Sequence, residues 1–255
     1  MELKPTLEEF RAQATGTGVL PVWREFLFDV DTAVTAYFKL VEPPFGFLLE
    51  SLLGGEQWAR YSFVGTRPAG AWRLQDGDVS WWTPEEGWEK VDATDPLEDL
   101  NKRLRVRVPA EIAGLPRFWG GAVGYFGYDV VREIETLPNA APDDLQLPDG
   151  LFLFTDVVLA IDNLLGRATA IVAVPVDGLD QDELRVVYDD AVATTTDVVD
   201  RLRSEPPPPP LQLANEPKVD PPFSSPTTRP DFEDAVETIL EYIRAGDALQ
   251  VVLSQ

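Results

Sequence analysis

Residues 71–82, AWRLQDGDVSWW, indicate most directly how this chain folds. Asp76-Gly77 lies between two arms rich in β-prone residues, and this dipeptide favours the left-handed torsions of a type I′ turn. A second pair of arms, Leu151–Ile161 and Ala168–Val174, is joined through Asn163–Gly166. Consecutive strands joined by short turns pair antiparallel. We therefore predict an α+β fold, an antiparallel-rich mixed sheet with packed helices, and not a doubly wound parallel sheet.

Apolar periodicity predicts the elements around these hairpins. Further strands are expected at Val19–Asp29, Phe45–Ser51, Arg60–Thr66 and Phe118–Phe126. Helices are expected at 33–41 with Asp31 as the N-cap, at 96–104 with Pro96 in the first position, and at 182–202.

Composition narrows the classes of function. The chain has 255 residues, with 21 basic and 44 acidic side chains, a net charge of −23, and neither cysteine nor histidine. These absences exclude a thiol nucleophile, a Ser-His-Asp triad, a zinc finger and disulfides, whereas Mg²⁺ with oxygen ligands stays allowed. The acidity argues against nucleic acid or an anionic membrane as a partner. Without a signal-peptide pattern or an apolar run of ~20 residues, the cytoplasm is the expected compartment.

The domain organisation follows from a change in composition. Residues 1–204 are predicted to form one domain, and 205–230 a proline-rich linker whose Pro206–Pro210 run reaches about 15 Å as polyproline II. Residues 231–255 contain a helix stopped by Gly246 and an apolar strand, Ala248–Leu253. One helix and one strand cannot bury each other. We therefore expect 231–255 to be the start of an incomplete second domain.

The densest mix of polar and apolar residues spans Leu48–Gly65. Two strands, a Gly-Gly loop and a solvent-facing Glu50 explain it structurally. Alternatively it is a small-ligand site at a strand end, where Glu50 holds an ammonium group, Ser51 offers a hydroxyl, and glycines admit a ligand to the backbone. Two other patterns carry no site. Gly120–Gly124 lacks the order of a phosphate-binding loop, and the carboxylates of Asp143, Asp144 and Asp149 lack calcium-loop spacing.

Three blocks of sequence, in order, resemble anthranilate synthase component I. The first is LLES at 48–51 with GGE at 54–56 and RYSFVG at 60–65; the second is FWGGAVGYFGYD at 118–129. The third, 232–255, ends in YIRAGDALQVVLSQ and is similar to the beginning of that family's chorismate-binding domain.

The resemblance implies a specific chemistry. Members of the family use Mg²⁺ and ammonia, which a glutamine amidotransferase subunit supplies, to convert chorismate to anthranilate and pyruvate at the start of tryptophan biosynthesis. L-tryptophan binds the N-terminal region as a feedback inhibitor. Carried onto this chain, the tryptophan-binding residues are Glu50, Ser51 and Arg60, and the chain is expected to form a hetero-oligomer with the amidotransferase subunit.

The catalytic half of the family pattern is not matched here. The family's magnesium-binding glutamates and catalytic histidine correspond to positions beyond Gln255, so no metal ligand is assigned and the chain alone is expected to be inactive. Gln250 is the one residue placed near the active site. Relatives that add water instead of ammonia to chorismate are similar in this strand but have a lysine at the position of Gln250. A lysine can activate water as a general base, whereas a neutral glutamine cannot, so Gln250 points to the enzymes that use ammonia. Two alternatives stay open: a fragment of aminodeoxychorismate synthase component I, and a non-catalytic tryptophan-binding module.

Overall fold

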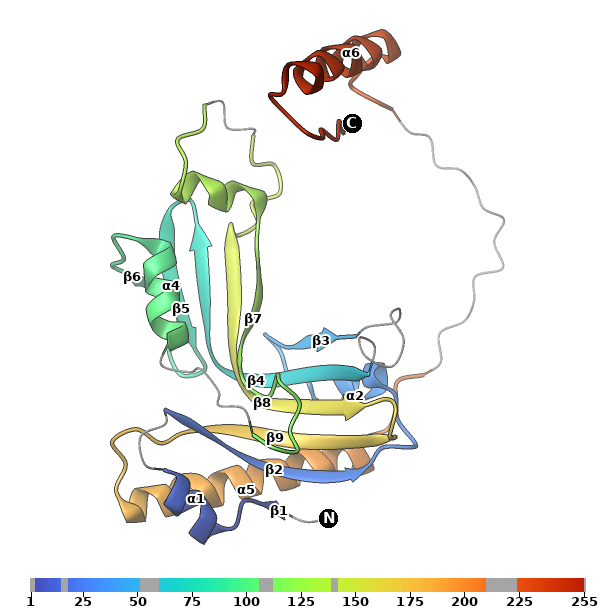
Figure 1. The fold of residues 1–255 in the computed structure, drawn as a ribbon. Coiled ribbons are helices and arrows are strands. Elements are labelled where there is room, and N and C mark those ends of the chain that lie inside the picture. Colours follow the sequence, from blue (N-terminus) through green and yellow to red (C-terminus); the bar gives the residue numbers. More distant parts are fainter. Residues whose placement is uncertain are drawn as a thin grey trace. The chain divides into compact units, whose positions relative to one another are not determined.

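The computed structural model describes residues 3–14, 18–50, 60–105, 112–138, 142–209 and 224–254. The chain divides into two compact units, Met1–Pro209 and Pro210–Gln255, which are treated separately below (Figure 1). Within the described residues, no helix is long and apolar enough to cross a membrane.

In the described part of the first unit, nine strands form one sheet in which every pairing is antiparallel. The main path runs β1-β2-β9-β8-β4-β5-β6, with β3 paired to β4 and β7 paired to β8. This confirms the predicted α+β class. The strands are β1 Leu3–Lys4, β2 Val19–Leu27, β3 Phe47–Leu49, β4 Tyr61–Gln75, β5 Asp78–Thr83, β6 Gly87–Val91, β7 Gly121–Phe126, β8 Gly150–Asp162 and β9 Arg167–Pro175.

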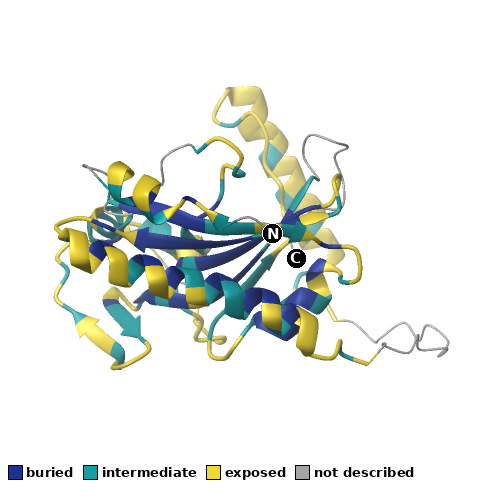
Figure 2. Cartoon of the chain, turned by 90° about the horizontal axis from the view of Figure 1, so that it is seen from below, coloured by how far each residue is buried: buried dark blue, intermediate teal, exposed yellow. Residues whose placement is uncertain are grey.

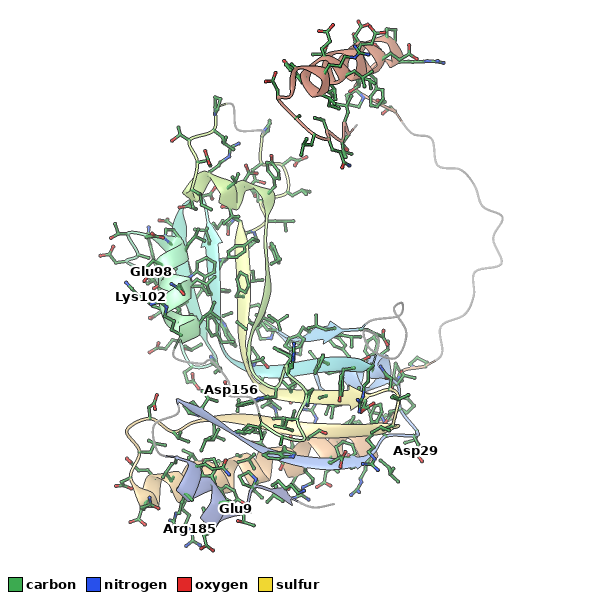
Figure 3. The ribbon with its side chains drawn as sticks, viewed as in Figure 1. Glu9, Asp29, Glu98, Lys102, Asp156 and Arg185 are labelled. Atoms are coloured by element: carbon green, nitrogen blue, oxygen red, sulfur yellow. The ribbon has the colours of Figure 1, made fainter. Side chains whose placement is uncertain are left out.

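The two long strands β4 and β8 run through both halves of the sheet. In one half they pair with β3 and β9, and in the other half with β5 and β7. The sheet turns sharply along these two strands (Figure 1). Their register shifts between Pro68 and Gly70, and Arg67 has a φ of +49°. Asp156, labelled in Figure 3, lies on β8 close to this turn. A proline is usually found at the edge or the end of a strand, but this local irregularity lets β4 continue past Pro68. The predicted short strand Arg60–Thr66 is therefore only the first half of β4.

Both predicted hairpins are present. Asp76 and Gly77 have φ values of +53° and +76°, the left-handed pair that a type I′ turn between β4 and β5 requires. In the turn between β8 and β9, Gly166 has a φ of +61°.

Helices cover different parts of the sheet. Helices α1 (Leu7–Gln13), α2 (Ala33–Leu40) and α5 (Gln181–Ser204) pack with β2, β4, β8 and β9 around the largest core cluster. In Figure 2 the strands behind α5 are largely buried, and α5 carries its exposed residues on the side away from them. Helix α4 (Pro96–Arg105) packs its Leu100 onto Trp72, Leu74 and Phe154 in the other half.

The N-cap of α2 differs from the prediction. Thr32 caps the helix, with its hydroxyl accepting from the Thr35 N–H at 3.1 Å. Asp31 instead forms a buried ion pair with Lys39, 2.9 Å between carboxylate and Nζ, and Lys39 also donates to the carbonyl of Leu202 at 2.8 Å. A buried ammonium group needs such a counter-charge, so the carboxylate of Asp31 is used inside the fold.

The second unit contains one described helix, α6 (Arg229–Ala245), which is capped by Thr228 and ended by Gly246 at φ +85°. None of its described residues is buried. The predicted strand Ala248–Leu253 is wrong: within 224–254 the backbone there is irregular and pairs with no described strand. A strand forms only when its backbone groups find a partner, and apolar composition alone does not supply one.

Candidate functional site

The pairing of β3 with β4 brings Glu50 and Arg60 to the same end of the sheet. Leu49 lies opposite Phe63 in the antiparallel register, Glu50 directly follows β3, and Arg60 directly precedes β4. The side chain of Glu50 is exposed and that of Arg60 is partly exposed. Ser51, the third predicted residue, lies outside the described residues, as do Gly54, Gly55 and Glu56.

Arg60 is held in place by Asp162, the last residue of β8. Its Nε and Nη2 donate to one carboxylate oxygen of Asp162 at 2.9 and 2.6 Å. The other carboxylate oxygen accepts the N–H groups of Leu164 and Leu165, each at 3.1 Å. Asp162 therefore joins Arg60 to the turn between β8 and β9.

These contacts set the ionisation of the pair. The hydrogen bond from Arg60 to Asp162 raises the pKa of the guanidinium. Burial acts to raise the pKa of Asp162, but the hydrogen bonds from Arg60 and from the Leu165 N–H outweigh it, so that this pKa lies below its usual range. The pair is thus fully charged at neutral pH.

Asn163 makes two further hydrogen bonds at this end of the sheet. Its backbone N–H donates to the Arg60 carbonyl at 2.8 Å, and its side-chain amide donates to the buried Ser62 hydroxyl at 3.0 Å. Neither Asp162 nor Asn163 was predicted from the sequence as a site residue. Their one sequence signal is their position: two polar residues that end a long apolar strand.

A cluster of aromatic side chains lies next to Arg60. Phe118 lies 5.2 Å from Phe63 and 6.2 Å from Phe47, measured between ring centroids, and Phe63 lies 6.0 Å from Tyr61. The Arg60 guanidinium lies 5.0 Å from the centre of the Tyr61 ring. Apolar rings therefore border a charged corner, an arrangement that suits a small amphipathic ligand.

A glycine permits the close packing of β3 on β4. A Cβ atom added to Gly65 would lie 1.9 Å from the ring of Phe47. Only glycine leaves room for this ring, which sits directly over the backbone of β4. The position of β3, and with it that of Glu50, depends on this contact.

Gln250, the predicted catalytic residue, belongs to the second unit. It lies in irregular backbone after α6, and its side chain is exposed. The structure therefore does not place it on a strand.

A cavity of about 830 Å³ is a separate feature of the first unit. It lies between the end of β2, the following loop and the last turns of α5, and Asp31 and Lys39 are among its lining residues. Neither Glu50 nor Arg60 lines it.

Comparisons with known proteins agree with this architecture. A model of the chorismate binding enzyme family matches residues 49–255. Anthranilate synthase component 1 of Pseudomonas putida is 40% identical over 97% of this chain and 50% of that protein. The same-named proteins of Aquifex aeolicus (34%, covering 100% and 51%) and Mycolicibacterium smegmatis (38%, covering 97% and 47%) are also similar.

A crystal structure of anthranilate synthase component I from Streptococcus pneumoniae supports the fold, with a TM-score of 0.53 and 24% identity over 87% of this chain and 46% of that one. The chain spans about half the length of the curated relatives it matches. With a family match across most of its residues, the chain belongs to the chorismate-binding enzymes.

Proposed function

We propose that this chain is the N-terminal, effector-binding part of an anthranilate synthase component I. The complete enzyme converts chorismate and ammonia to anthranilate, pyruvate and water in the cytoplasm, as a step of tryptophan biosynthesis, and L-tryptophan inhibits it. The observation that carries the proposal is the naming of relatives that are 34–40% identical over nearly the whole chain. Their designation as component 1 supports a second component as partner, a glutamine amidotransferase subunit that supplies ammonia.

The end of the sheet that carries Glu50 and Arg60 offers the functional groups that can bind tryptophan. Glu50 provides a carboxylate for the α-ammonium group, and Ser51 a hydroxyl. Arg60 directs two N–H groups to Asp162, and a guanidinium has five, so others serve the ligand carboxylate. The rings of Tyr61 and Phe63 offer the indole an apolar surface.

The reaction itself belongs to the other half of the enzyme in this proposal. Ammonia adds at the ring carbon beside the carboxylate-bearing one, the ring hydroxyl leaves as water, and elimination of the enolpyruvyl group as pyruvate makes the ring aromatic. Gln250 is proposed to lie near the reacting ring, where its neutral amide can donate or accept a hydrogen bond but cannot act as a general base.

Mg²⁺ is the cofactor proposed for the complete enzyme. Among the described residues, however, no three carboxylate side chains come close enough together to hold a metal ion. These residues therefore do not fit a Mg²⁺ site.

A chimera tests the proposed function. This chain replaces the corresponding half of Pseudomonas putida anthranilate synthase component 1, and the chimera is supplied with chorismate, ammonia and Mg²⁺. We expect anthranilate, detected by its fluorescence. Because the catalytic half of the chimera comes from the Pseudomonas putida enzyme, anthranilate formation tests whether this chain can complete that enzyme. A folded chimera that forms no anthranilate would contradict the proposal.

A further inference from the structure

The segment that connects β7 to β8 forms a surface that the proposed effector site does not use. We call it the crown and define it as the described residues 128–138 and 142–149. It begins with the 3₁₀ helix η1 (Tyr128–Glu133) and lies at the end of β7 and β8 far from the β8–β9 turn (Figure 1). The side chains drawn on it in Figure 3 project outward from the sheet.

The crown exposes large apolar side chains. Tyr128 is 87% exposed, Ile134 70%, Leu145 72% and Leu147 62%. Single exposed apolar residues are ordinary on a protein surface, but several within one short connection between neighbouring strands mark an interaction surface.

Polar contacts hold the crown in shape while these apolar side chains stay exposed. Arg132 donates to Asp129 at 2.7 Å and to the carbonyl of Leu137 at 3.1 Å. Asp143 accepts the N–H of Gln146 at 2.8 Å. A surface ordered in advance loses little conformational entropy when a partner binds.

The base of the crown is tied to the sheet. Asp149 accepts the Gly127 N–H through its carbonyl at 2.6 Å and the Asp76 N–H through its carboxylate at 3.2 Å. Tyr125 of β7 donates to the Pro148 carbonyl at 3.2 Å. Hydrogen bonds from the β4–β5 hairpin and from the β7–β8 pair thus both hold the base of the crown.

The charge of the crown selects the kind of partner. Its described residues carry six carboxylates and one guanidinium, a stronger acidic excess than the 44 to 21 of the whole chain. The acidic residues are Asp129, Glu133, Glu135, Asp143, Asp144 and Asp149, and the basic one is Arg132. Complementary charge across an interface accelerates association and excludes partners of the same sign.

We propose that the crown is the docking surface for a protein partner that presents an apolar patch edged by lysine and arginine. This inference rests on the proposed function in one respect: the second component of the synthase is taken as that partner.

Binding of the second component of Pseudomonas putida anthranilate synthase to the 255-residue chain tests the proposal, measured by biolayer interferometry at 50 and 300 mM NaCl. We expect Leu145→Ser/Leu147→Ser to weaken binding at least tenfold, because the variant removes exposed apolar contacts. The matched control is Val186→Ser on α5, a residue 59% exposed in the free chain, which should bind like the wild type.

Charge reversal gives an independent variant. Asp144→Lys should slow association severalfold at 50 mM NaCl and less at 300 mM, whereas Asp190→Lys on α5 should have little effect at either. Circular dichroism verifies the fold of each variant. Absence of binding by the wild-type chain, or equal binding by wild-type and crown variants, would overturn the proposal.

The chimera separates failure of this inference from failure of the proposed function. Crown variants should lower the ratio of glutamine-dependent to ammonia-dependent anthranilate formation at least fivefold. If the wild-type chimera forms no anthranilate from ammonia, the proposed function fails. If it does, and crown variants leave the ratio unchanged, the docking inference alone fails.

Discussion

The contact between Gly65 and Phe47 allows the link between fold and site to be tested by substitution. In Gly65→Ala the new methyl group would lie 1.9, 2.2 and 2.6 Å from three ring carbons of Phe47. Carbon atoms in ordinary contact are about 3.5–4.0 Å apart, so the ring must move by roughly 1.6–2.1 Å. Overpacking of this kind costs about 1–3 kcal/mol in free energy of unfolding. Since Phe47 belongs to β3, the displacement also moves Glu50.

A double-mutant cycle isolates this cause. The free energy of unfolding is measured by urea titration with tryptophan fluorescence, in the wild type and in Phe47→Ala. We expect Gly65→Ala to cost about 1–3 kcal/mol in the wild type and under about 0.5 kcal/mol in Phe47→Ala, where the ring is absent. An equal cost in both backgrounds would refute the claim that the ring of Phe47 requires glycine at 65.

Two further predictions concern buried and partly buried charges. Lys39→Met should lower the free energy of unfolding by about 3–5 kcal/mol, because it leaves the buried carboxylate of Asp31 without its counter-charge. The double variant Asp31→Leu/Lys39→Met should lose less stability than this single variant. Urea unfolding of both variants measures the two losses, and a larger loss in the double variant would contradict the prediction. Because the folded-state pKa of Asp162 is lowered, its stabilising contribution is present above the unfolded-state pKa of about 3.9 and is lost as the pH falls through the lower folded value. The stability gap between wild type and Asp162→Asn should therefore narrow from pH 6 to pH 3, and a gap that stays constant would count against this charge pairing.

The sequence features that predicted the fold correctly are those that favour a single local conformation. Asp76-Gly77 has few alternatives to a type I′ turn, and Gly246 ends α6 in the left-handed conformation expected of it. The predicted strand Arg60–Thr66 was too short, because β4 continues past Pro68, where its register with β8 shifts.

Predictions failed where a distant partner decided the outcome. Asp31 is a good N-cap by type, but Lys39 competes for its carboxylate, and Thr32 caps the helix instead. Ala248–Leu253 has the composition of a buried strand but no strand partner among the described residues. Local periodicity contains no information on either partner.

The placement of two candidate site residues was predicted in part, and their binding of a ligand stays a prediction. The strand ends at Glu50 and Arg60 follow from local pattern, and the structure brings them to one end of the sheet. Asp162 lies 102 positions from Arg60 in the sequence, and the contact arises only through the β4–β8 register. An ion pair between residues so far apart in the sequence can be predicted only when the strand order and register of the sheet are known.

The response of the chimera to L-tryptophan tests the central claim most directly. Anthranilate formation is measured over a range of tryptophan concentrations for the wild type, for Ser51→Phe and for the control Val186→Ser. We expect tryptophan to inhibit the wild type and the control alike. Ser51→Phe, whose ring would fill a small-ligand pocket, should raise the half-inhibitory concentration at least tenfold. Identical inhibition of all three, or no inhibition of the wild type, would contradict it.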